Sequence, residues 1–129
     1  WVLCELNREF PTWLTIWPRE RLDKLFNAKT VKTGNEVFDK RFNLSSDNEA
    51  AALQILTPGR MEQILALADS SFGKFAVNLN HDGRMYLAVH SGRGFFDIGK
   101  GRETPELLRQ RFTRELQWFT DMIDAFRDA

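Results

Sequence analysis

Apolar and polar positions alternate most regularly in the middle of the chain. Alternation with a period of two places every second side chain on the same face of a strand. Two such runs flank the turn-forming sequence Asn-His-Asp-Gly at 80–83, and together they predict a β-hairpin. The apolar positions are Phe75, Val77 and Leu79 in the first run and Met85, Leu87 and Val89 in the second.

Shorter runs rich in β-branched and aromatic residues lie near the N-terminus. Residues 2–6 and 12–17 are separated by a turn-prone segment and predict a hairpin or two neighbouring strands. The second run places Leu14 and Ile16 on one face and Trp13 and Trp17 on the other. Weaker strand patterns occur at 30–33, 41–45 and 95–98, and residues 19–29 predict a short helix.

Capping residues mark the starts of two consecutive helices. Ser46 is followed three residues later by Glu49, a capping-box spacing that predicts a helix over 47–55. The Thr-Pro pair at 57–58 predicts a second helix that ends near Ser70, because threonine caps a first turn and proline fits its first position.

The last predicted helix is the longest. Thr104 and Pro105 mark its start, and apolar residues then recur at spacings of three and four. A helix of about 23 residues is on the order of 35 Å long, so it can cross a whole sheet face. Its predicted buried stripe consists of Leu108, Phe112, Leu116, Phe119, Ile123 and Phe126.

These elements predict one α+β domain over residues 1–129. A small, mostly antiparallel sheet of about five to seven strands carries two inserted helices, and the long C-terminal helix packs on one of its faces. With 129 residues, 43% of them apolar, the chain has the size and composition of a domain with one core. Because it begins at Trp1 without an initiator methionine or a signal-peptide pattern, we expect a soluble fragment of a longer protein.

The charge balance limits the kinds of partner. The 18 basic residues match 18 acidic ones, so no overall field attracts the domain to nucleic acid or to an anionic membrane. The single cysteine, Cys4, excludes an internal disulfide and a cysteine-rich zinc site, and its apolar surroundings predict a small core residue. No apolar run approaches the length of a transmembrane helix.

The sequence carries no recognisable catalytic pattern. Nucleophilic catalysis needs a serine or cysteine beside a histidine base, but His81 and His90 fall at a turn and a strand end, and no G-x-S-x-G motif occurs. We therefore expect no catalytic residue, cofactor or metal, and an unrecognised hydrolase is the most distant alternative. Turn chemistry explains the metal-like set His81, Asp82, His90 and Asp97, and a solvated helix face explains Asp121, Asp124 and Asp128.

The best ligand candidate is a glycine-rich stretch before the last helix. Arg93, Lys100 and Arg102 lie in or beside residues 91–101, which lead into a helix N-terminus whose N–H groups can meet an anion. These three residues form a candidate site for an anion or a lipid headgroup. The stretch lacks the phosphate-loop and dinucleotide-binding glycine patterns, so glycine turns with surface cations are the simpler explanation.

Trp13 and Trp17 form the second candidate, an interaction surface. They lie near Arg19 and Arg21, and aromatic residues and arginine are enriched at protein interfaces and membrane surfaces. The alternative is that a neighbouring helix covers both rings. Their exposure in the structure separates these two interpretations.

Residues 33–65, TGNEVFDKRFNLSSDNEAAALQILTPGRMEQIL, resemble a bacterial family of unknown function. They share its core G-x-x-x-FD-x-x-F followed by LTP, and a weaker likeness extends over residues 10–126. The resemblance implies a domain behind one or two transmembrane helices, on the cytoplasmic side of the inner membrane, with no catalytic residue to carry over. The matching residues are Gly34, Phe38, Asp39, Phe42, Leu44, Ser46, Asp47, Ala51, Leu56, Thr57 and Pro58.

The matching residues have architectural explanations. Phe38 and Phe42 are expected to pack, and Asp39 to accept backbone N–H bonds near Gly34. We therefore expect a non-catalytic module of a bacterial membrane protein that binds protein, either a second copy or another chain, with its membrane contact through a missing upstream segment. The alternative is a domain that binds an anionic ligand or lipid headgroup through Arg93, Lys100 and Arg102.

Overall fold

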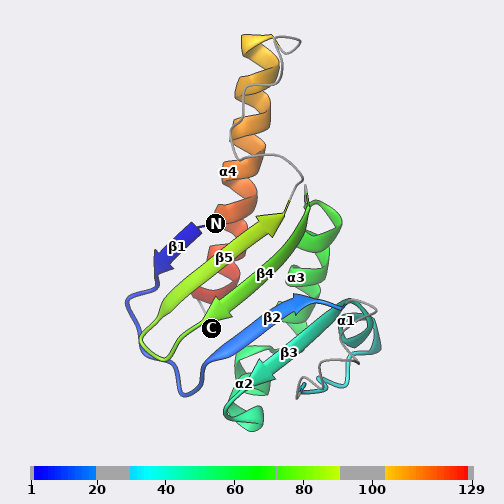
Figure 1. Cartoon of the computed structure of the whole chain (residues 1–129), viewed down its shortest axis with the longest axis vertical. Coiled ribbons are helices and arrows are strands. Elements are labelled where there is room, and N and C mark those ends of the chain that lie inside the picture. Colours follow the sequence, from blue (N-terminus) through cyan, green and yellow to red (C-terminus); the bar gives the residue numbers. More distant parts are fainter. Residues whose placement is uncertain (1, 20–29, 72, 91–103, 128–129) are drawn as a thin grey trace.

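The chain folds into a five-stranded antiparallel sheet with helices packed on it, which confirms the predicted α+β class (Figure 1). The computed structural model describes residues 2–19, 30–71, 73–90 and 104–127. Its strands are β1 (Val2–Glu5), β2 (Leu14–Pro18), β3 (Phe42–Ser46), β4 (Lys74–Leu79) and β5 (Arg84–His90). Its helices are α1 (Glu36–Arg41), α2 (Glu49–Ile55), α3 (Pro58–Asp69) and α4 (Pro105–Arg127).

The strand order is β1-β5-β4-β2-β3, and every neighbouring pair is antiparallel. The predicted β4–β5 hairpin is confirmed, with Val77 opposite Leu87. The predicted pairing of the first two strands is wrong, because β1 pairs with β5 whereas β2 lies between β4 and β3. The segment between them passes the β4–β5 turn instead, where Leu6 N donates to the Gly83 carbonyl at 3.0 Å.

The helices cover one face of the sheet and form the core with it. Figure 1 shows α2, α3 and α4 behind the sheet, with α4 crossing β5 and projecting beyond the sheet end. Trp118 of α4 contacts Phe75 of β4 at 5.2 Å between ring centroids, and its indole N–H donates to the Leu67 carbonyl of α3 at 2.8 Å. The core side chains that are at most 1% exposed include Leu14, Ile16, Phe38, Leu44, Ile64, Val77, Leu79, Met85, Leu87, Met122 and Phe126.

Two of the predicted helix starts are confirmed and one is wrong. The Thr57 hydroxyl accepts from Arg60 N at 3.3 Å, and the Thr104 hydroxyl accepts from Leu107 N at 3.2 Å. The predicted capping box at Ser46 does not form. Asn48 caps α2 instead, because its side chain accepts from Ala51 N at 3.1 Å, and the helix begins two residues later than expected.

Three further predictions need correction. Residues 36–41 form the short helix α1, which the pattern did not predict, and residues 30–33 form no strand, although Val31 N donates to the Leu44 carbonyl at 2.7 Å. On α4, Leu116 is 55% exposed, because the buried arc runs through Glu115, Trp118 and Met122 instead. The helix expected within 19–29 and the strand expected over 95–98 fall outside the described residues.

Candidate functional site

None of the described helices covers the second face of the sheet (Figure 1). Strand alternation places on it the residues between the core positions. Two rows of side chains without charge cross its middle. One row is Leu3, Tyr86, Asn78, Thr15 and Ser45, and the next contains Ala88 and Ala76 on β5 and β4 and Trp17 on β2. Asn43 of β3 continues the second row but is buried, at 3% exposed. We call the eight residues other than Asn43 the open face.

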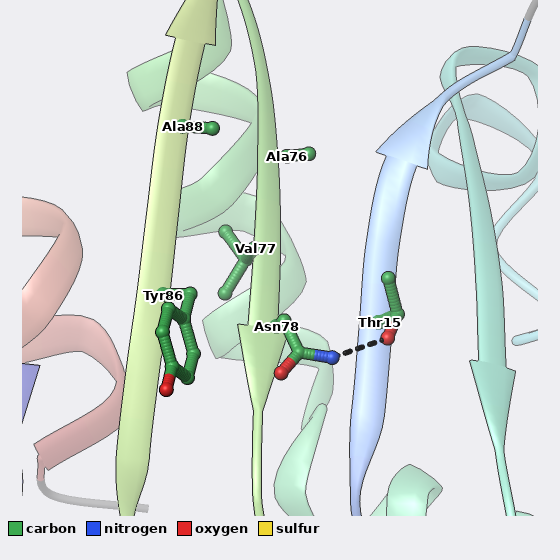
Figure 2. A pocket seen from close by; sticks show the side chains of 6 residues that line it. All are labelled: Thr15, Ala76, Val77, Asn78, Tyr86 and Ala88. Atoms are coloured by element: carbon green, nitrogen blue, oxygen red, sulfur yellow. Dashed lines mark hydrogen bonds between the residues drawn. The ribbon is translucent and has the colours of Figure 1, made fainter. Parts of the chain in front are cut away.

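A shallow hollow of about 360 Å³ lies at the centre of the open face (Figure 2). Ala76 and Ala88 form its floor, and their small side chains leave room beside the Tyr86 ring. The Asn78 side-chain amide donates to the Thr15 hydroxyl at 2.7 Å, so these polar groups are paired across β4 and β2. The hollow therefore offers mostly apolar surface to a partner.

The two tryptophans predicted as an interaction surface lie at this side of β2. Trp17 belongs to the open face, and Trp13 directly precedes the strand. Both are partly buried, and the described helices α2, α3 and α4 lie on the other side of the sheet (Figure 1). The helix expected over 19–29 falls largely outside the described residues, so both interpretations of the tryptophans stay predictions.

A hydrogen-bonded network at one end of the sheet centres on Asp47. Its Oδ1 accepts from the hydroxyl of the buried Thr12 and, at 3.2 Å, from Trp13 N. Its Oδ2 lies 2.9 Å from His81 Nε2, and His81 Nδ1 lies 3.3 Å from the Phe10 carbonyl. We call these residues the Asp47 network, and it joins the segment before β2, the β3–α2 junction and the β4–β5 turn.

The Asp47 network holds a carboxylate but no activated nucleophile. The Thr12 hydroxyl, together with His81 and Trp13 N–H, lowers the pKa of Asp47 below its ordinary value, although partial desolvation opposes the shift. Both ring nitrogens of His81 face acceptors, so neither is directed at a hydroxyl as a general base requires. The arrangement fits a clamp between three segments better than a catalytic triad.

Asp39 has the architectural role that was predicted for it. Its Oδ1 accepts from Thr33 N at 3.0 Å and from the Thr33 hydroxyl at 2.8 Å, and its Oδ2 accepts from Gly34 N at 3.3 Å. These bonds hold the tight turn before α1, where Gly34 has a φ of 86°. Both carboxylate oxygens of Asp39 are therefore used inside the fold.

The remaining candidates do not converge on one cavity. His90 ends β5 and Asp82 lies in the β4–β5 turn, and no group of three metal-ligating side chains occurs among the residues that the structure describes. Cys4 is half-buried and packs against the core. Asp121 and Asp124 are exposed, as expected for a solvated face. Arg93, Asp97, Lys100, Arg102, Arg21 and Asp128 lie outside the described residues.

Sequence reasoning missed the Asp47 network and the open face. Asp47 and His81 are separated by 34 residues, so no local spacing indicates their contact. The open face left a readable signal, because Ala76, Asn78, Tyr86 and Ala88 are the small or polar partners in the alternating hairpin. Several of these positions hold apolar groups where a fully solvated face would carry charge.

The family model for DUF3137, a protein of unknown function, matches residues 1–127. The chain belongs to the DUF3137 family. No curated protein and no solved structure matches the chain. In the described segments of this DUF3137 domain, every helix is too short or too polar to serve as a membrane span.

Proposed function

We propose that this DUF3137 domain is a non-catalytic assembly module that packs its open face against a second copy of the chain. The observation that carries the proposal is an uncharged sheet face with a mostly apolar hollow at its centre, on the side opposite the described helices (Figure 2). Sheets with an apolar face normally bury it against another layer. Tyr86 and Trp17 are residue types enriched in the centres of protein interfaces.

A second copy suits the charge of this surface. None of the eight residues of the open face has a charged side chain, so two copies can meet without opposing like charges. Glu5 and Arg84 lie opposite each other at the rim, and each could meet its counterpart of opposite sign on the partner copy. A symmetric dimer is the commonest form of self-assembly.

The size of the face predicts weak association. Five strands of about five residues present roughly 400 Å² of flat surface per copy. Stable complexes bury about 800 Å² per partner, so we expect a dissociation constant in the micromolar range or above. Attachment of the chains to one membrane would raise their effective concentration and favour the dimer.

The membrane setting is the second part of the proposal. The family resemblance of residues 33–65 supports a module on the cytoplasmic side of a bacterial inner membrane, joined to it by a segment upstream of this chain. A fusion of a reporter to the C-terminus of the full-length gene product tests this setting. Reporter activity restricted to the cytoplasm is expected, and periplasmic activity would contradict it.

Sedimentation equilibrium tests the assembly directly. We expect the average mass of the wild-type chain to rise above that of a monomer between about 10 μM and about 1 mM. Leu3→Glu and Ala88→Glu place a charge on the open face, so each should weaken association at least about tenfold. Leu116→Glu is the matched control, because Leu116 on α4 is 55% exposed and Leu3 is 49% exposed.

Two results would contradict the proposal. One is a monomeric mass at every concentration. The other is loss of association in Leu116→Glu with no change in Leu3→Glu and Ala88→Glu, which would move the interface to α4.

A further inference from the structure

A second hollow, of about 330 Å³, lies at the end of the sheet where β2 ends and where β3 and β4 begin. Four cations of the described part of the chain line it: Arg19, Lys40, Arg41 and Lys74. They come from the end of β2, the end of α1 and the start of β4, which lie far apart in the sequence. We call this hollow the cationic cleft.

The charged residues that are described in the lining of the cationic cleft are all basic. Among the described residues that line it, none is acidic. Asp69 lies beside the cleft, where its Oδ1 accepts from Arg41 Nη1 at 2.8 Å. The fold therefore gathers four of its 18 cations around one small volume, although the chain as a whole has no net charge. Such a concentration of one sign raises the local density of anions.

Hydrogen bonds to neighbouring residues position the two arginines of the cleft. Asp69 fixes one N–H of Arg41, and a guanidinium carries five N–H donors in all. Arg19 Nε donates to the Asn43 side chain at 3.4 Å, and Arg19 N donates to the Arg41 carbonyl at 2.9 Å. A positioned guanidinium loses little conformational entropy when it binds an anion.

The floor of the cleft is apolar, and it includes two phenylalanines that are almost completely buried. Phe42 and Phe75 line it with ring centroids 5.3 Å apart, and Pro18 and Ala68 add apolar surface. A free inorganic anion would use the cations but leave this floor unoccupied. A ligand that joins an anionic group to an apolar group would use both.

We propose that the cationic cleft binds a phosphate ester that carries an apolar or ring substituent. A phosphate group offers several oxygens and up to two charges, so it can bond with several cations at once, whereas a carboxylate brings one charge. The volume is at the lower end of small-ligand sites, which begin at about 300 Å³. The site shares no residue with the open face and does not depend on the proposed assembly.

The test uses phenyl phosphate, inorganic phosphate and vesicles as separate probes in calorimetric and co-sedimentation titrations of the whole chain. We expect phenyl phosphate to bind more tightly than inorganic phosphate, and its affinity to fall as salt is raised. The double variant Arg19→Gln/Lys40→Gln should lower that affinity at least about tenfold. Arg84→Gln is the control, because Arg84 lies at the other end of the sheet. Its Nε is 3.4 Å from Oδ2 of Asp82.

The vesicle arm separates the two sources of a phosphate ester. Vesicles of phosphatidylcholine with about one-third phosphatidylglycerol present the ester as a lipid headgroup. Binding of these vesicles that is lost in the double variant, without binding of phenyl phosphate, assigns the cleft to a lipid. Binding of phenyl phosphate alone assigns it to a free ester. Absence of both, or equal binding by the double variant and the wild type, overturns the proposal.

Discussion

At the residue scale, three glycines differ in two respects: the strain of their backbone conformation and the space available for a Cβ atom. Gly83 and Gly34 both have a φ of 86°, a conformation that side chains with a Cβ rarely adopt. A Cβ at Gly83 would also lie 2.2 Å from the Arg8 carbonyl oxygen, whereas a Cβ at Gly34 or Gly59 would meet nothing within 4 Å. The segment before β2 therefore passes directly over the β4–β5 turn at Gly83.

Alanine substitutions at these glycines should give graded effects. Gly34→Ala should lower the free energy of unfolding by about 1 kcal/mol through strain alone. Gly83→Ala should lower it by more than about 2 kcal/mol, because strain and a backbone clash add. Gly59→Ala, in α3, should raise it by about 0.5 kcal/mol. Urea denaturation measures all three, and equal losses at Gly34 and Gly83 would contradict the close approach of Arg8.

Asp47 predicts a specific dependence of stability on pH. Because its pKa is lowered in the folded state, its stabilising contribution is present above the unfolded pKa, about 3.9, and is lost as pH falls through the lower folded value. Asp47→Asn should therefore lower the melting temperature clearly at pH 6 and progressively less as the pH falls below the unfolded pKa and through the folded one. A melting-temperature difference that stays constant over this range would contradict the role of the carboxylate.

The two carboxylates show what a sequence reveals at this scale. The bonds of Asp39 to Thr33 and Gly34 span six residues or fewer, so turn chemistry predicted them. The bonds of Asp47 to Thr12 and His81 span 35 and 34 residues and depend on the order of the strands. Local spacing carries no information about such contacts.

At the scale of elements, the start of α2 illustrates competition between two caps. The sequence predicted Ser46 as the cap, but its hydroxyl bonds to Thr12 at 2.6 Å and accepts from Asn48 N at 3.1 Å. Asn48 then caps the helix. Asn48→Ala should lower the free energy of unfolding by about 1 kcal/mol, and Glu49→Ala by less than about 0.5 kcal/mol. Equal losses in urea denaturation would favour the capping box.

The strands and the three longer helices were predictable, but the shortest helix was not. The β4–β5 hairpin and α4 carry enough alternating or three- and four-spaced positions to fix their type. Helix α1 has 6 residues, too few for a helical period to show. The partner of β1 was also hidden, because hydrophobic alternation gives the faces of a strand but does not give its neighbour.

At the scale of the whole molecule, the net charge is zero, but basic and acidic residues gather on different surfaces. The open face is uncharged, the cationic cleft collects Arg19, Lys40, Arg41 and Lys74, and exposed acids such as Asp121 and Asp124 lie on α4. Composition alone therefore excluded an overall field but could not indicate a local one. The antiparallel topology creates both surfaces, since it places unrelated segments side by side.

Intermolecular paramagnetic relaxation is the most direct test of the central claim, that the open face packs against a second copy. A spin label is attached at the rim, in Glu5→Cys on a Cys4→Ser background, and mixed with isotope-labelled chain that carries no spin label. We predict broadening of partner amides along β4 and β5, including those of Ala76, Asn78 and Ala88, that disappears on dilution. Broadening confined to α4, or none at millimolar concentration, would contradict the account.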